Sequence, residues 1–507
     1  MALSKVFTGT IIGLEPILVT CEINIENRGF PKFTLVGLPS KEVEESKLRI
    51  RSALINSGYD FPQHKITVNL APANIPKKGS LYDLPIAVAI LKATGQITAD
   101  LSSKLFMGEL SLDGGIRAVH GSIVLSDLCK KGMTYLYLPK ENHIEASLIT
   151  KMHIKSVKSL RELVRHLEGI EFIYNTPKVT FKNDISYDVL LDDIQEQEHA
   201  KRALIISAAG AHNLALTGPP GTGKSMLAKA LQSILPPLTK EEQREVLKIR
   251  SVVDLVTKDV LVRPFRSPHH TISKVGLIGG GSNIRPGEIT LAHRGILFMD
   301  EFNEYPRSII ESLRQPLEDK KITISRASGS VSFPASFTLI VANNPCPCGY
   351  LNSTIKPCTC SYSEIKRYQK RISGPIWDRI DMYVSMKEFK TSKISLKAKK
   401  GKRVNELTKK ARNLVFVARE KQLKRYKKEF YKTNAEQGNK AILKYAKLSP
   451  ESKETLKRST DMLGLSPRGY FKIIKVARTI ADLDASDVVE VNHILEALSY
   501  RNNTQNK

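Results

Sequence analysis

One stretch of the chain has the residue types and spacing of a phosphate-binding loop. Residues 218–225 fit the pattern G-x-x-x-x-G-K-[ST]. Glycines let backbone N–H groups turn toward phosphate oxygens at a helix N-terminus. We expect Lys224 to reach the β- and γ-phosphates of ATP and Ser225 to ligate Mg²⁺. The predicted nucleotide-binding residues are Gly218, Pro219, Pro220, Gly221, Thr222, Gly223, Lys224 and Ser225.

Two acids at the end of an apolar run supply the second half of such a site. Residues 296–299 are apolar, and Asp300 and Glu301 follow them directly. Hydrolysis of a bound nucleotide needs a carboxylate for Mg²⁺ and a group that positions the attacking water. We assign Asp300 to Mg²⁺, together with Ser225, and Glu301 to the water. A solvated acid at a strand end is the alternative reading of Glu301.

Four of the six cysteines lie close together in the sequence. They form two Cys-x-Cys pairs across a short loop with Gly and Pro, and they are Cys346, Cys348, Cys358 and Cys360. Tetrahedral zinc accepts four thiolates, so we expect a structural zinc ion. The one-residue spacing is tighter than the usual two, and free thiols are the alternative. Cys21 and Cys129 are isolated, and we expect them to be small core residues.

The elements around these motifs predict an α/β core. The apolar run 214–216 suits a buried strand before the loop, and 226–231 suits a helix after it. Residues 337–341 suit another strand that ends near Asn344. Beyond residue 387 the chain reads as helical, with Gly464 ending one helix and Pro467 opening the next. These elements would position the phosphate-binding residues at strand ends.

The composition favours a polyanionic partner. The 507 residues suggest about two to four domains and carry a formal net charge of +27. Such an excess favours nucleic acid; solvated lysine-rich faces are the alternative. The sharpest basic clusters are 397–403 and 424–428, and both are rich in lysine, which suits phosphate contacts. No apolar run reaches roughly 18 residues and no leader is evident at the start, so we expect a cytoplasmic protein without membrane contact.

Further motifs in the middle of the chain point to one family. Residues 265–271 read Phe-Arg-Ser-Pro-His-His-Thr, and 286–293 read Pro-Gly-Glu-Ile-Thr-Leu-Ala-His. Residues 313–318 read Leu-Arg-Gln-Pro-Leu-Glu, and 344–349 read Asn-Pro-Cys-Pro-Cys-Gly. In this order, with Gly279–Gly281 between them, they closely resemble the ComM/YifB family, the magnesium-chelatase-like AAA+ ATPases of bacteria. The resemblance covers nearly the whole chain.

The resemblance implies roles for three more residues. Asn344 resembles the sensor-1 residue that orients the lytic water. Arg379 resembles the arginine finger that reaches the nucleotide of a neighbouring subunit in a ring. Arg468 resembles sensor 2, which closes the site of its own subunit from a lid. Without the family, these would read as surface arginines and a strand-end asparagine. The predicted catalytic residues are therefore Glu301, Asn344, Arg379 and Arg468.

Three other positions are interpreted through the same resemblance. Residues 322–333 resemble a hairpin that points into the ring channel, where Arg326 would touch DNA. His269 and His270 read as loop residues rather than metal ligands, because adjacent side chains point apart. Before the P-loop the chain has Glu196-Gln197 where members usually have Gly-Gln, so we expect a glycine conformation to be lost there.

The N-terminal third is similar to the proteolytic domain of Lon proteases. The similarity rests on residues 107–115 and 138–142. The Ser–Lys dyad of that domain would fall near Leu81 and Ile123, which cannot do its chemistry. Ser80 is one residue off. We therefore expect a Lon-like fold without protease activity, with Lys77, Lys78, Arg49 and Arg51 presenting charge to DNA instead.

Together these observations predict an α/β protein in three parts. We expect an α+β Lon-like domain at 1–172, an AAA+ P-loop core at 185–386 with a four-cysteine loop at 346–360, and a basic helical lid at 387–507. The family implies an ATP-driven hexameric motor that acts on branched or single-stranded DNA without sequence preference. Its activity would be branch migration or helicase activity in recombination during natural transformation. The alternatives are a chelatase-like ATPase that remodels a protein partner and an ATP-dependent protease.

Overall fold

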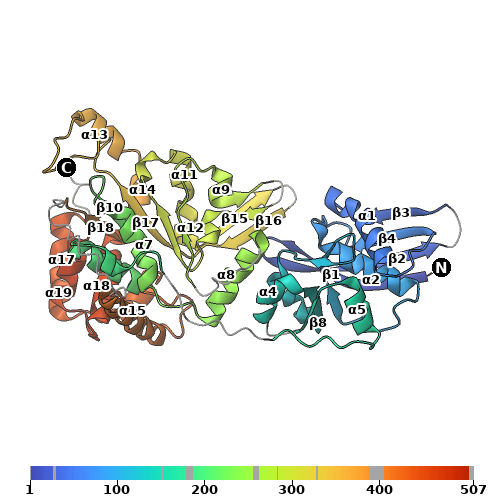
Figure 1. The fold of residues 1–507 in the computed structure, drawn as a ribbon. Helices are drawn as coiled ribbons and strands as arrows, with labels where there is room; N and C mark the ends of the chain where they lie inside the picture. The colour runs from blue at the N-terminus through green and yellow to red at the C-terminus, as the bar shows by residue number, and fades with distance from the viewer. Residues whose placement is uncertain are drawn as a thin grey trace, which may run out of the picture. The chain divides into compact units, whose positions relative to one another are not determined.

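The computed structural model forms two compact units, which Figure 1 shows as ribbons. Unit 1 comprises Met1–Asn183, Lys240–Leu261 and Asn283–Arg285, and unit 2 comprises Asp184–Thr239, Val262–Ser282 and Pro286–Lys507. A helix that lies between the P-loop and Asp300 in the sequence therefore belongs to unit 1. The structure describes residues 2–26, 30–149, 152–177, 187–254, 262–281, 284–326, 329–388 and 405–501.

Unit 1 is built on a mixed seven-stranded sheet in the order β3-β4-β2-β1-β5-β8-β9. The strands β1, β2 and β4 pair in antiparallel fashion, whereas the other pairs are parallel. Alternate residues of β2 are buried, including Cys21, which is a core residue as predicted. The strands are β1 (Ala2–Ile12), β2 (Glu15–Glu26), β3 (Lys32–Val36), β4 (Lys65–Ala71), β5 (Lys104–Phe106), β8 (Tyr135–Pro139) and β9 (His153–Val157).

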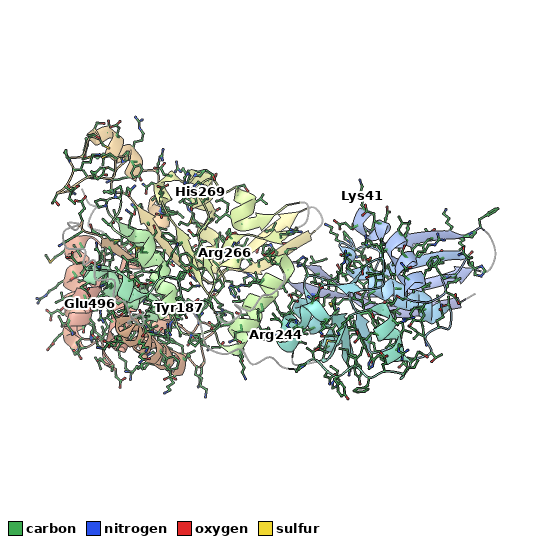
Figure 2. The ribbon with its side chains drawn as sticks, in the orientation of Figure 1. Lys41, Tyr187, Arg244, Arg266, His269 and Glu496 are labelled. Atoms are coloured by element: carbon green, nitrogen blue, oxygen red, sulfur yellow. The ribbon has the colours of Figure 1, made fainter. Side chains whose placement is uncertain are left out.

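The helices of unit 1 are mostly amphipathic, but α2 is buried almost all round. The inserted helix α8 (Lys240–Val253) packs Leu247 against Ile123, and Arg244 Nη2 lies 2.6 Å from Asp127 Oδ1. Arg244 is labelled in Figure 2. The remaining helices include α1 (Lys41–Asn56), η1 (Ser80–Tyr82), α2 (Asp83–Ala93), α3 (Ser122–Leu125), α4 (His143–Ser147) and α5 (Leu160–Leu167).

Unit 2 contains a parallel five-stranded sheet, which fits the predicted α/β core. Its order is β11-β14-β17-β10-β18, and every neighbouring pair is parallel. The strands β14 and β17 are buried throughout, as the apolar runs predicted. The strands are β10 (Leu214–Thr217), β11 (Phe265–Arg266), β14 (Ile296–Met299), β17 (Thr338–Asn343) and β18 (Met382–Ser385). This confirms an α/β core with a parallel sheet.

Helices cover both faces of this sheet. One apolar core joins β10, β14 and β17 to α6 (Glu198–Gly210), α7 (Lys224–Ile234), α15 and α18. The other joins the opposite side chains of those strands to shorter helices. They are α9 (Lys274–Ile278), α10 (Glu288–Leu291), α11 (Arg307–Ser312), α12 (Arg314–Asp319) and α14 (Gly374–Trp377). The antiparallel hairpin β15 (Lys321–Arg326) and β16 (Gly329–Pro334) also forms as predicted; the side chain of Arg326 lies outside the described part.

The last part of unit 2 is helical, and Figure 1 shows its helices in orange and red. Gly464 has φ +56° and ends α17, and Ser466 caps α18, with Pro467 in its first turn, as predicted. The helices are α15 (Glu406–Arg425), α16 (Asn439–Tyr445), α17 (Pro450–Leu463), α18 (Pro467–Leu483) and α19 (Val491–Ser499). The basic cluster 397–403 lies outside the described residues. None of the described helices has the length and apolar character to cross a membrane.

Candidate active site

The predicted phosphate-binding loop, residues 218–225, lies between β10 and α7, at the carboxyl end of β10. Gly221 and Gly223 have φ angles of +78° and +87°, a region that side chains rarely adopt. A Cβ on Gly218 would lie 2.9 Å from the carbonyl oxygen of Met386. Thr222 Oγ1 donates to the carbonyl oxygen of Pro219 at 2.9 Å, which fixes the turn. These glycines are therefore required by the backbone of the loop.

Lys224 is held inside the loop by three acceptors. Its Nζ donates to the carbonyl oxygens of Gly218 at 2.5 Å and Pro219 at 2.9 Å, and to Asn344 Oδ1 at 3.1 Å. Burial lowers the pKa of Lys224, and Asp300 and Glu301 oppose this change. The structure thus brings Asn344 to the lysine of the loop, although the two are far apart in the sequence.

The acids after β14 lie at the same edge of the sheet. β10, β14 and β17 are parallel, so the loop, Asp300 and Asn344 all follow carboxyl strand ends. Ser225 Oγ donates to Asp300 Oδ2 at 2.7 Å. A hydroxyl and a carboxylate side by side fit the oxygen ligands that Mg²⁺ takes near phosphates. Glu301 has φ +48°, a strained backbone of the kind that collects at functional sites.

The two histidines after β11 correct one expectation. Their side chains do not point apart, because the ring centroids of His269 and His270 lie 4.0 Å from each other. His270 Nδ1 lies 3.5 Å from Glu301 Oε2, and Tyr305 donates from its hydroxyl to the carbonyl oxygen of Pro268 at 2.6 Å. The loop that carries His269 and His270 therefore lies beside Glu301. The positions of the two histidines in the sequence did not predict this contact.

The family motifs also contact one another. Arg266 forms a two-bond ion pair with Glu288, with Nε–Oε2 at 2.5 Å and Nη2–Oε1 at 2.7 Å. Figure 2 labels Arg266, which belongs to β11, and His269, which follows that strand. The pair ties the segment 265–271 to α10. These motifs therefore support the backbone that carries His270.

Arg379 lies at the other edge of the sheet. Asn213 precedes β10 and donates from Nδ2 to the carbonyl oxygen of Arg379 at 3.0 Å. Asp381 precedes β18 and accepts from the backbone N–H of Asn213 at 3.0 Å. Both contacts lie at amino strand ends, whereas the P-loop follows a carboxyl end. A four-residue strand is about 13 Å long, so Arg379 lies away from its own P-loop.

Arg468 and Arg379 lie side by side because both contact Glu318. Arg379 Nη2 and Arg468 Nη2 each lie 2.7 Å from the same oxygen, Glu318 Oε1. The two guanidinium groups hold the pKa of Glu318 below its usual range, against the effect of burial. The geometry therefore places the two arginines together on one carboxylate, and the sensor-2 role of Arg468 stays a prediction. Glu318 belongs to the quoted motif 313–318 but had no predicted role.

A buried ion pair supports this second edge. Lys472 Nζ lies 3.3 Å from Asp381 Oδ1 and donates to the carbonyl oxygen of Ile380 at 2.6 Å. Burial would raise the pKa of Asp381, but Lys472 and His212 outweigh it and hold the pKa well below its usual value. Burial lowers the pKa of Lys472 to about 8. The pair fixes the segment that carries Arg379.

At Glu196-Gln197, where members of the family usually have Gly-Gln, the expected loss of the glycine backbone conformation does not occur. Both residues keep the left-handed conformation, with φ angles of +51° and +59°. Gln197 donates from Nε2 to the carbonyl oxygen of Lys387 at 2.7 Å. The glycine conformation is therefore retained without glycine, at a cost of about 1–2 kcal/mol per residue.

The four cysteines of the loop come together. Their sulfurs all lie within 4.8 Å of one another, with Cys346–Cys348 at 3.4 Å and Cys346–Cys358 at 3.7 Å. Four thiolates about 2.3 Å from a zinc ion would be about 3.8 Å apart. Backbone N–H groups of Tyr350 and Thr359 lower the pKa of the Cys348 thiol to about 5. The group fits a tetrahedral metal ion, with Cys360 as its fourth member.

The cysteine loop is anchored around the P-loop. A Cβ on Gly349, which has φ +84°, would lie 2.7 Å from Pro220 Cδ. Asn344, which binds Lys224, precedes Cys346 by two residues. Ser353 Oγ donates to Glu388 Oε1 at 2.7 Å. Glu388 follows Met386 by two residues, and the carbonyl oxygen of Met386 faces Gly218. The cysteine loop thus packs closely on Pro220 of the predicted phosphate-binding loop and follows directly on Asn344, which binds Lys224.

Some of the side chains expected to contact DNA are bound within their own unit, whereas Lys424, Lys427 and Lys428 are exposed and stay predicted contacts. Lys77 is buried and its Nζ donates to the carbonyl oxygen of Pro72, and Arg49 is bound to buried Asp83 at 2.7 Å. Within the cluster 424–428, Arg425 pairs with Asp482 at 2.8 Å and Tyr426 is buried. These side chains are used inside their units. Sequence could not reveal the two ion pairs, because Asp83 and Asp482 lie 34 and 57 residues from their arginines along the chain.

The region of the Lon-like dyad has its own contacts. Ser80 donates from Oγ to Glu109 Oε2. Leu81 is half-buried in the core, and Ile123 packs against Leu247 of α8. Ser122, next to Ile123, donates to Glu145. Ser80 therefore hydrogen-bonds to a carboxylate. The similarity of unit 1 to the Lon proteolytic domain stays a prediction.

Family models of magnesium chelatase match three segments of the chain. The model of magnesium chelatase subunit ChlI matches residues 190–394, which contain residues 218–225, Asp300, Glu301, Asn344 and Arg379 but not Arg468. A model of subunit ChlI of Mg-chelatase matches residues 21–142, and one of its C-terminal part matches 405–501. The matches therefore extend over both units.

Similar proteins cover the chain almost completely. The competence protein ComM of Haemophilus influenzae is 40% identical over 508 residues, which is 99% of this chain and 98% of that protein. The YifB protein of Salmonella typhimurium is 42% identical over 504 residues, 99% of this chain and 97% of that protein. The magnesium-chelatase subunit ChlI of Chlorella vulgaris is 27% identical over 175 residues, 29% of this chain and 49% of that protein.

Proposed function

This chain belongs to the ComM/YifB family of magnesium-chelatase-like proteins, and on that premise we propose that it is an ATP-hydrolysing motor that acts on DNA. The observation that carries the proposal is the constellation of Lys224, Ser225, Asp300 and Asn344 at one sheet edge. Its family suggests ATPase activity.

When ATP binds, Lys224 would release its hydrogen bonds to carbonyl oxygens of the loop and bind phosphate oxygens instead. Lys224 Nζ is bound to two loop carbonyls, and the β- and γ-phosphates of ATP would replace them. Gly221 and Gly223 turn the loop backbone, so its N–H groups and the α7 N-terminus can face the phosphates. Ser225 and Asp300 would hold Mg²⁺, which neutralises developing charge on the phosphates.

Hydrolysis would be carried by Glu301 and Asn344. Glu301 would accept a proton from the attacking water, and its strained backbone fixes the start of its side chain. Asn344 reaches Lys224, so its amide is close to the γ-phosphate position and can orient the water. His270 lies beside Glu301 and would hold the carboxylate in place.

Arg379 and Arg468 would complete the site of a neighbouring subunit. They lie together on Glu318, at the opposite sheet edge from Lys224 of the same chain. A guanidinium group at a subunit edge stabilises charge on a phosphate supplied by the next subunit. We therefore propose a ring, expected to be a hexamer, in which each nucleotide is shared by two subunits.

DNA is the proposed substrate of the motor. The formal net charge of +27 favours a polyanion, and the hairpin of β15 and β16 would enter the ring channel. The relative in Haemophilus influenzae is described as a competence protein. By analogy, we propose branch migration or helicase activity during recombination in natural transformation. The alternative is an ATPase that remodels a protein partner, which the matches to chelatase subunits favour.

The cysteine group is proposed to hold a structural zinc ion. The sulfur distances fit four thiolate ligands, and Leu351 donates from its N–H to Cys346 Sγ at 3.3 Å. Four protein ligands would fill the tetrahedral shell, so we propose no reaction at the metal. Metal analysis of the reduced protein should find one zinc per chain, and a Cys360→Ser variant should lose it.

A branch-migration assay on a four-way DNA junction tests the proposal. The protein should move the branch point in the presence of ATP and Mg²⁺, and Lys224→Ala should abolish this because the phosphates lose their lysine. Remodelling of a protein partner predicts no movement of the junction with either form. That result would favour the alternative.

A further inference from the structure

A groove of about 800 Å³ lies on unit 2 beside the acids of the active site. One side is formed by residues 304–307, which follow Glu301, and the other by α13 (Tyr362–Gln369) and the residues after it. Its charged lining consists of five cations and one acid: Arg307, Lys366, Arg367, Lys370, Arg371 and Glu304. The members of this set come from two separate segments, so no local sequence pattern indicates it.

The charge of the groove is poorly balanced by protein groups. Glu304 is bound to Arg371 Nη1 at 2.8 Å. Among the residues that the structure describes, none of the other four cations lies within ion-pair distance of an acid, although Arg367 contributes to lowering the pKa of Glu364 on the same helix. Like charges at this density repel one another and favour an anionic partner. The tyrosine at the start of α13 is 71% exposed, and Lys366 Nζ lies 4.6 Å from its ring centroid.

We propose that this groove binds the phosphate backbone of DNA. The inference rests on the proposed function and names the surface through which the substrate would be held. An open groove lined by several separate cations suits a chain of phosphates better than one anion. Lysines and arginines on an exposed helix make phosphate contacts without reading the sequence, which fits a motor that acts on any DNA.

The groove is connected to the catalytic acid by hydrogen bonds. Arg371 Nη1 donates to the carbonyl oxygen of Asn303 at 3.1 Å, and Asn303 Nδ2 donates to the carbonyl oxygen of Tyr368 at 3.0 Å. The backbone N–H of Glu304 donates to the carbonyl oxygen of Glu301 at 2.7 Å. A phosphate that competes with Glu304 for Arg371 would act on the turn that begins at Glu301. DNA binding and ATP hydrolysis are thereby coupled.

The test is DNA binding by a double variant at several salt concentrations. Lys366→Gln with Lys370→Gln removes two exposed cations spaced by four residues and leaves Arg371 in place. Lys453→Gln with Lys457→Gln on α17 is the matched control, because these exposed lysines have the same spacing. The probe is a fluorescent duplex of arbitrary sequence. Each lost phosphate contact reduces the slope of log affinity against log salt by about 0.9.

We expect the groove variant to lose about 1.8 from the slope and to bind the duplex about tenfold more weakly at low salt. The control should bind like the wild type, and both variants should hydrolyse ATP normally without DNA. If the wild type binds DNA and the groove variant shows the same slope of log affinity against log salt, the groove is not the DNA-binding surface. The proposed function would not be affected by that result. If the groove variant has an unchanged slope but a different oligomeric mass from the wild type, the proposed DNA contact is wrong. The groove would then be a contact between subunits. A wild type that binds no DNA would overturn the proposed function itself.

Discussion

Glu318 is expected to position both arginines of the proposed shared site. Its Oε1 accepts from Arg379 and Arg468, each at 2.7 Å. Without the carboxylate, two neighbouring guanidinium groups would repel each other and separate. The substitution Glu318→Gln keeps the size of the side chain and removes its charge. It therefore tests whether this carboxylate holds the arginines in place for hydrolysis.

The expected magnitude follows from the exposure of the pair. A hydrogen bond to a charged group contributes about 1.5–3 kcal/mol when buried, whereas an exposed ion pair contributes about 0–1 kcal/mol. Glu318 is 45% exposed and Arg379 only 11%, so we take about 1 kcal/mol for this pair and about 0.5 kcal/mol for the pair with Arg468. Loss of both would slow hydrolysis about tenfold.

Steady-state ATP hydrolysis measures this effect. For Glu318→Gln we expect kcat to fall about tenfold while KM for ATP changes less than about twofold, because the arginines act on the transition state. Asp319→Asn is the matched control, an exposed acid one residue away in α12. An unchanged kcat would refute a positioning role. A higher kcat would mean that Glu318 restrains the arginines instead.

Three further predictions concern the site. Glu301→Gln should bind ATP with normal affinity but hydrolyse it at least about a hundredfold more slowly; near-normal turnover would remove Glu301 from the mechanism. Because the pKa of Asp381 is lowered, the stability that it contributes is present above pH about 4 and is lost as pH falls below this, so Asp381→Asn should show a lower Tm at pH 7 and a flatter Tm profile below about pH 4. A Tm profile parallel to that of the wild type would contradict this. Gly349→Ala should weaken ATP binding but retain zinc, because its Cβ would press on Pro220; equal ATP affinity would show that the cysteine loop does not support the P-loop.

The residues at the carboxyl strand ends could be predicted from sequence because each motif is local. A P-loop needs glycines at fixed offsets, and Asp300 follows a buried strand directly. The helical breaks at Gly464 and Pro467 were predictable for the same reason. Parallel pairing then brings separate strand ends together without further information.

Contacts between distant segments could not be predicted in this way. Glu318 and Arg468 are 150 residues apart in the sequence, yet they share a hydrogen bond. Arg49 reads as a surface cation until Asp83 is placed beside it. The left-handed conformation of Glu196 runs against its residue type, so only the fold that surrounds it can impose it. Such positions depend on tertiary packing rather than on local pattern.

The stimulation of ATP hydrolysis by DNA tests the central claim most directly. The rate is measured for the wild type with and without single-stranded and branched DNA, with Lys224→Ala as a control for contaminating ATPases. We predict that DNA raises the rate several-fold and that the rise disappears as the salt concentration increases, because the contacts are to phosphates. A rate that no DNA changes at any salt concentration would contradict a motor on DNA and favour an ATPase that acts on a protein.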